Sequence, residues 1–165
     1  MHPLLLIGLI AAAVIALIIR RLRGEPLTAR ELFGAPLILI AIGGYSVVKL
    51  PVFTPTDGVW LGAGAVAGLG FGALRGLTIR LFTREGVLWQ RYTGWTFGVW
   101  VLSFAGNFGL GHLAVACGMH ADARPMPLSI GVSLLGEALV IGKRALDSGV
   151  PFAPSERISY GARRS

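Results

Sequence analysis

Five long apolar stretches constrain the fold of this chain more than any other feature. They cover about residues 3–19, 35–50, 58–79, 95–117 and 128–142. About 20 apolar residues are enough for an α-helix to cross the hydrocarbon core of a bilayer. Only 14% of the residues are charged, whereas about 25% are charged in an ordinary soluble protein. The sequence therefore predicts an all-α membrane protein, a bundle of five transmembrane helices.

The basic residues predict the orientation of this bundle. Cytoplasmic loops of membrane proteins carry an excess of lysine and arginine. Twelve of the 15 basic residues fall on one predicted side, only Arg124 falls on the other, and Lys49 and Arg75 lie within or at the ends of spans. We therefore expect the N-terminus outside and the C-terminus in the cytoplasm. Because the first arginines follow the first apolar stretch, we interpret that stretch as an uncleaved helix and not as a signal peptide.

The five spans leave little chain for another domain. We expect residues 1–146 to form one transmembrane domain and residues 147–165, which lack an apolar period, to form a disordered cytoplasmic tail. The single cysteine, Cys117, excludes an intramolecular disulfide. The net charge of +7 comes mainly from the predicted cytoplasmic loops. The expected partners are therefore the lipid bilayer and its anionic headgroups, and not nucleic acid.

Local signals predict where several elements begin. Thr28 and Glu31 have the spacing of a capping box, which predicts a helix from Ala29 that continues into the second span. Either Thr56 or Asp57 is expected to cap the third span. Residues 80–92 alternate apolar and polar side chains around a Glu-Gly pair, so they form either a short interfacial hairpin or a loop with aromatic anchors.

Four glycines, Gly64, Gly68, Gly72 and Gly76, recur every fourth residue in the third span. This spacing places them along nearly one face of a helix, where another backbone can approach closely. The stripe indicates tight packing within the bundle or, as an alternative, contact between copies of the chain.

Four polar residues lie at depth in the predicted spans. Arg75 and Glu137 each lie roughly 8 Å inside the inner boundary, so they are expected either to pair structurally or to line a functional cavity. Asn107 and His112 lie in the fourth span among glycines. They favour a hydrogen bond to a neighbouring helix, with a cation site, a proton relay or a haem ligand as alternatives. No catalytic residue, metal site or cofactor is predicted.

Three segments carry a family resemblance: PLILIAIGG at 36–44, GLGFGALRGLTIRLF at 68–82 and EGVLWQRY at 85–92. In these segments the chain resembles the CcdC-like family of small bacterial multi-span membrane proteins. The resemblance implies a multi-pass protein of the bacterial plasma membrane, which is the inner membrane, and it assigns no catalytic residues.

Packing signals outweigh chemical ones, because the chain has no P-loop, HExxH or GxSxG motif. The leading hypothesis is a non-enzymatic scaffold or assembly helper that binds a membrane-protein partner or forms a homo-oligomer. The alternative is a small transporter or channel with a polar path near Arg75, Glu137 and Asn107. An intramembrane enzyme or a haem-handling protein is the third hypothesis.

Overall fold

The computed structural model describes residues 8, 12, 15, 16 and 18–154, so most of the first predicted span lies outside the described residues. Four described helices are long and apolar enough to cross a membrane. They are α2 (Ala29–Val48), α3 (Pro55–Thr78), α4 (Gly94–Ala116) and α5 (Met126–Ser148). The mainly helical fold is therefore confirmed, and these four helices have the length and composition of membrane spans. The count of five spans and the orientation stay predictions.

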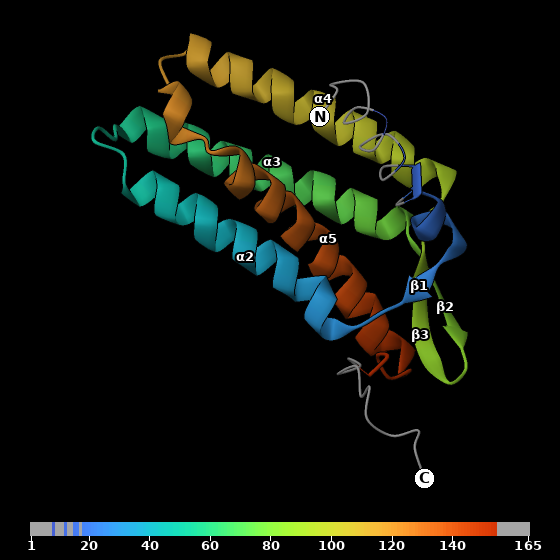
Figure 1. The fold of residues 1–165 in the computed structure, drawn as a ribbon. Helices are drawn as coiled ribbons and strands as arrows, with labels where there is room; N and C mark the ends of the chain where they lie inside the picture. The colour runs from blue at the N-terminus through green and yellow to red at the C-terminus, as the bar shows by residue number, and fades with distance from the viewer. Residues whose placement is uncertain (1–7, 9–11, 13–14, 17, 155–165) are drawn as a thin grey trace.

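The four helices run back and forth between two ends of the bundle (Figure 1). A small β-sheet lies at one end, which we call the sheet end. The connections 49–54 and 117–125 lie at the other, which we call the loop end. Helix α5 packs between α2 and α3, and α4 packs against α3. Gly131 of α5 faces α2, where an added Cβ would lie 2.9 Å from the Ile40 nitrogen, and Gly136 faces α3.

Side-chain caps fix the starts of the helices. Thr28 accepts a hydrogen bond from the Glu31 nitrogen, and α2 begins at Ala29 as predicted. Helix α3 begins three residues before the predicted Gly58, because Thr54 is its cap. Asp57 is instead the reciprocal partner in this capping box, since its carboxylate accepts a 2.8 Å hydrogen bond from the Thr54 nitrogen. The prediction that Thr56 or Asp57 is the cap was wrong.

Residues 80–92 adopt the hairpin, the first of the two alternatives. Strands β2 (Arg80–Arg84) and β3 (Val87–Arg91) pair antiparallel, and β1 (Glu25–Pro26) pairs with the other edge of β3. The turn residues Glu85 and Gly86 have φ values of 56° and 77°, as a type I′ turn requires. The all-α prediction omitted this sheet.

The chain beyond α5 returns to the sheet. Gly149 ends the helix with φ 67°, and the Leu88 nitrogen then donates to the Pro151 carbonyl at 3.1 Å. The Ala153 nitrogen donates to the Leu27 carbonyl at 2.9 Å. Disorder from residue 147 onward therefore does not hold for residues 147–154, because they complete α5 or form these backbone hydrogen bonds. Residues 155–165 lie outside the described residues.

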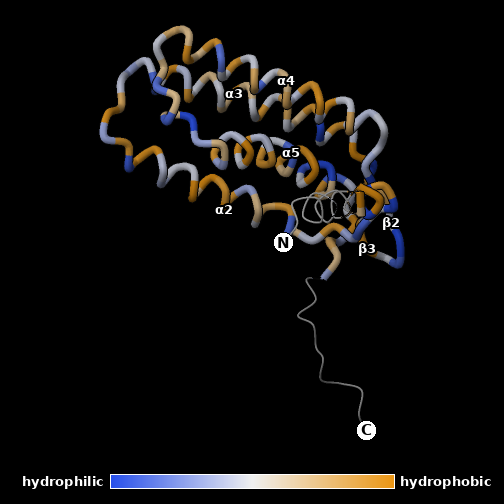
Figure 2. Tube along the Cα trace, turned by 45° about the horizontal axis from the view of Figure 1, so that its top comes forward, coloured by the Kyte–Doolittle hydropathy of each residue, from blue (hydrophilic) through white to orange (hydrophobic). Residues whose placement is uncertain are grey.

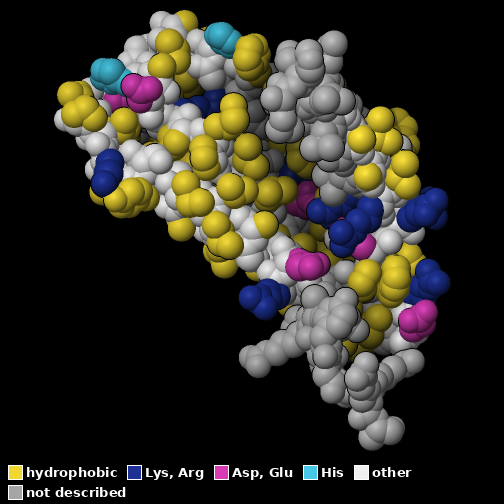
Figure 3. All heavy atoms as spheres, viewed as in Figure 1, with side chains coloured by type: hydrophobic (Ala, Val, Ile, Leu, Met, Phe, Trp, Pro, Cys, Tyr) yellow, Lys and Arg dark blue, Asp and Glu magenta, His cyan; other side chains and the backbone are white. Residues whose placement is uncertain are grey.

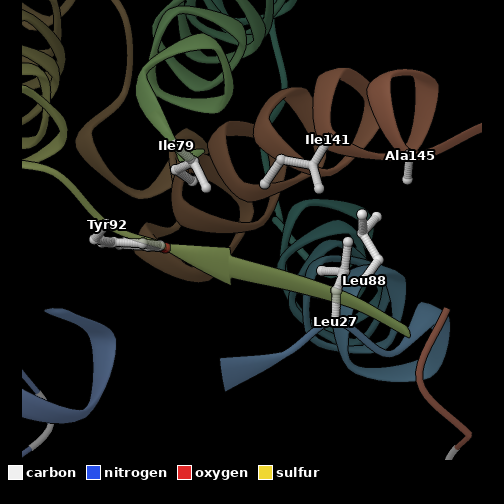
Figure 4. Close-up of a cluster of buried hydrophobic side chains, with 6 residues drawn as sticks. All are labelled: Leu27, Ile79, Leu88, Tyr92, Ile141 and Ala145. Atoms are coloured by element: carbon white, nitrogen blue, oxygen red, sulfur yellow. The ribbon is translucent and has the colours of Figure 1, made fainter. Parts of the chain in front are cut away.

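The buried apolar cores are small and lie at the two ends. The sheet-end core consists of Leu27, Ile79, Leu88, Tyr92, Ile141 and Ala145 (Figure 4). Ala114, Met119 and Ala123 form the loop-end core. Large apolar side chains are otherwise exposed on all four helices, for example Ile38, which is 61% exposed. Figure 2 shows that hydrophobic residues occur along these helices. Such an exterior is suited to lipid as a solvent.

Basic side chains gather at the sheet end (Figure 3). Arg80, Arg84 and Arg91 lie on the strands, and Arg144 donates to the carbonyls of Gly76 and Ile79 at the end of α3. Within the described residues, the basic side chains on β2, β3 and the end of α5 that the sequence assigned to one side thus lie at one end of the bundle. Which compartment this end faces stays a prediction.

Candidate functional site

The site begins with the close contact of α3 and α5, which the glycine stripe permits. An added Cβ at Gly72 would overlap the Ser133 carbonyl oxygen, and at Gly76 it would lie 2.9 Å from the Glu137 carbonyl oxygen. Gly68 packs more loosely against the same helix. Gly64 does not meet α5; its nearest neighbour is the guanidinium of Arg124. Three of the four glycines therefore pack α3 against α5 within one chain.

This contact brings Arg75 and Glu137 together in a buried ion pair, with side chains 2% and 9% exposed. Arg75 Nε donates to Glu137 Oε2. The guanidinium also lies 3.4 Å from Ser133 Oγ and 4.4 Å from the centre of the Trp100 ring. A charge at this depth is costly unless a partner neutralises it. Each member of the pair supplies that partner for the other.

Tyr92, the last residue of the segment 80–92, completes this centre, and the sequence did not predict this role. Its hydroxyl donates a 2.9 Å hydrogen bond to Glu137 Oε1. Burial, assisted by the negative charge of Glu137, raises the pKa of the Tyr92 phenol above its ordinary value of 10.0. The phenol therefore stays protonated and donating at neutral pH, and both oxygens of Glu137 are occupied.

A groove of about 570 Å³ lies between α4 and α5. It exists because α4 packs on α3 and leaves its other face unpaired with α5. The α4 side is formed by residues spaced three and four apart, which share one helical face. They are Trp100, Ser103, Phe104, Asn107, Phe108, Gly111, His112 and Val115. Met126, Ser129, Ile130, Ser133 and Leu134 form the facing stripe on α5.

Three of the four predicted polar residues reach this groove, namely Arg75, Asn107 and His112, whereas Glu137 does not line it. Asn107 Nδ2 donates to the Ser103 carbonyl in its own helix. The His112 ring lies edge-on to Phe108 in the same helix, with ring centres 4.4 Å apart. No group of three or more His, Cys, Asp or Glu residues that could hold a metal ion occurs in the described part of the chain.

Arg124 lies in the connection between α4 and α5, as the sequence predicted, and its side chain also lines the groove. The sequence did not predict that its guanidinium folds back between α3 and α4 and donates to the backbone oxygen and Oδ1 of Asn107, both at 3.0 Å. A Cβ at Gly111 would lie 2.7 Å from Arg124 Nη1, so this glycine makes room for it. Asn107 thus serves as the acceptor for an arginine from the loop end.

A second unexpected contact fixes the loop end. The buried carboxylate of Asp57 accepts a 2.7 Å hydrogen bond from the His120 nitrogen, and its other oxygen lies 2.9 Å from His120 Nδ1. This contact holds the short helix η1 (Ala121–Ala123), which leads to Arg124, against the start of α3. The two partners are 63 residues apart, so no local spacing reveals them.

No family model, curated protein or solved structure matches the chain. The resemblance to the CcdC-like family therefore stays a prediction from the sequence.

Proposed function

We propose that this protein is a non-enzymatic scaffold or assembly helper of the bacterial inner membrane, which acts by binding a second membrane protein. The observation that carries the proposal is the internal satisfaction of the buried charges. Arg75 takes one oxygen of Glu137 and Tyr92 takes the other. The two charges therefore neutralise each other inside the protein, and these groups stabilise the packing of the bundle.

The same observation weighs against a transporter or channel. A polar path would need Arg75, Glu137 and Asn107 to face one water-filled passage. Glu137 lies off the groove, Arg75 is 2% exposed, and the Asn107 carbonyl oxygens are occupied by Arg124. The groove walls are mainly apolar, which suits binding better than conduction of a polar solute.

Site-specific photo-crosslinking in native membranes tests the scaffold proposal. A photoreactive residue is placed at outward positions of the four helices, Ile38, Val66, Val101 and Leu139, all of which are exposed. The expected result is a discrete adduct that contains a second membrane protein on at least one face. Adducts with lipid alone, or with a second copy of this chain alone, would overturn the proposal.

The orientation belongs to the same proposal and has its own test. We expect the sheet end, with its arginines, to face the cytoplasm, because the positive-inside rule places loop arginines there. A reporter that is active only in the cytoplasm should therefore be active when it is fused after Ser165. Activity of a periplasmic reporter at this position would contradict the proposed orientation.

A further inference from the structure

We propose that the groove between α4 and α5 is a binding site for an anionic phospholipid, with the phosphate at Arg124 and an acyl chain lying along the groove toward Trp100. This inference goes beyond the scaffold proposal and does not depend on it. It concerns the loop end of the bundle, and thus a different place from the sheet-end arginines that the sequence analysis assigned to lipid headgroups.

The groove has the size of a site for a small molecule or an acyl chain. From Trp100 to Val115 the groove follows α4 for about 22 Å at 1.5 Å per residue. The groove measures about 570 Å³, which lies within the range of small-molecule sites, about 300–1,000 Å³.

The lining gives the groove an amphipathic character. Its long walls are formed by apolar and aromatic side chains such as Phe104, Ile130 and Leu134. Its charged and titratable lining residues are Arg75 and Arg124 with His112 and His120, and no carboxylate occurs among the described lining residues. An apolar tail with a negative headgroup complements this combination.

Arg124 is positioned to hold the headgroup. No carboxylate among the described residues lies within salt-bridge distance of it. Its two hydrogen bonds to Asn107 fix the guanidinium, and a guanidinium has five N–H donors. The donors left over can bind phosphate oxygens, with which arginine forms charge-assisted hydrogen bonds. Of the two arginines that line the groove, Arg75 is already neutralised by Glu137. The positive charge left in the groove is therefore that of Arg124, at the loop end.

Native mass spectrometry of the detergent-purified full chain tests the headgroup contact. Phosphatidylglycerol is the probe and phosphatidylcholine with the same chains is the neutral comparison. The wild-type chain should retain one phosphatidylglycerol in preference to phosphatidylcholine. Arg124→Gln should weaken that preference about tenfold, as expected for the loss of a hydrogen bond to a charged group. The control Arg80→Gln removes an exposed sheet-end charge and should leave the preference unchanged.

Three outcomes would overturn the proposal. Equal retention of phosphatidylglycerol by the wild type and Arg124→Gln would remove the headgroup contact. Loss of retention in Arg80→Gln alone would place the lipid at the sheet end. A protein co-purified in the groove in place of lipid would likewise contradict the site.

Fluorescence quenching locates the acyl chain of the lipid even if Arg124→Gln fails to fold. Phosphatidylglycerol with brominated acyl chains should quench the wild-type tryptophan emission more than brominated phosphatidylcholine does. Trp100→Phe should remove that difference, because Trp100 lines the groove. The matched control Trp95→Phe, at an 81% exposed position outside the groove, should retain it. The same difference in both variants would place the lipid elsewhere and overturn the proposal.

Discussion

The hydroxyl of Tyr92 lies 2.9 Å from Glu137 Oε1, and this hydrogen bond ties the end of strand β3 to the middle of α5. Because Arg75 of α3 holds the other carboxylate oxygen, the sheet and two helices share one buried polar centre. The stability of the sheet end and that of the helix packing are therefore coupled through three side chains.

Tyr92→Phe should destabilise the protein by about 1–2 kcal/mol, because a buried carboxylate oxygen loses its donor. Thermal unfolding in detergent measures the effect. The control is Tyr45→Phe, since Tyr45 is 60% exposed. Equal melting temperatures for the two variants would show that the hydrogen bond to Glu137 contributes nothing.

The same phenol predicts how stability responds to alkaline pH. Burial raises the pKa of Tyr92 in the folded protein above 10.0, so above that pH the unfolded chain releases a proton that the folded chain keeps. The stabilising contribution is thus complete below about pH 10 and is lost as the pH rises further. The wild type should lose melting temperature more steeply than Tyr92→Phe above about pH 10. Parallel curves would contradict the raised pKa.

Breaking the Arg75–Glu137 pair on one side should be far more harmful than removing both charges. Glu137→Leu or Arg75→Met alone leaves a buried charge unpaired, at a cost of about 3–5 kcal/mol. The double variant should recover much of that loss, because apolar replacement of a whole buried pair is often nearly neutral.

Accumulation in membranes and unfolding in detergent measure this comparison. Asp147→Asn is the control, since it breaks the Lys143–Asp147 pair, whose side chains are 78% and 62% exposed. It should change neither readout. A double variant as unstable as the sum of the single variants would show that the two charges act independently.

The glycine stripe gives a matched test within one helix. Gly72→Ala should destabilise the protein by about 3 kcal/mol or more, because its Cβ would overlap the Ser133 carbonyl oxygen and force α3 and α5 apart. At Gly70 an added Cβ meets nothing within 4 Å. Gly70→Ala should therefore be neutral or stabilise by up to about 1 kcal/mol through helix propensity. Similar melting temperatures for both variants would show that the close contact is unnecessary.

The sequence predicted well those structural features that depend only on residues close together in the chain. The helical segments follow from continuous apolar runs, and Thr28 was identified because a capping box needs only four consecutive residues. The hairpin stayed one of two alternatives, although Glu85-Gly86 occupies its turn. The pairing of Arg75 with Glu137 also stayed one of two alternatives. The sequence predicted that both residues lie at the same depth in the membrane, but it did not predict whether their helices turn these side chains toward each other.

Features that depend on residues far apart were missed. β1 has only two residues, and its strand character comes from pairing with β3, which lies more than 60 positions later in the chain. The loop position of Arg124 was predicted, but its contact with Asn107 was missed, because that contact needs the space that Gly111 leaves in another helix. Asp57 was assigned a local capping role, and its second contact with His120 has no short-range signature.

Helix α5 meets backbone on both flanks, with Gly131 against α2 and Gly136 against α3. Rotation of α5 about its own axis would replace these glycines with larger side chains at the contacts with α2 and α3, so the two contacts fix the orientation of α5. Helix α4 packs chiefly on α3, and swinging it breaks no glycine-mediated contact with α5. A widening of the groove between α4 and α5 therefore requires α4 to move, while α2, α3 and α5 keep their positions.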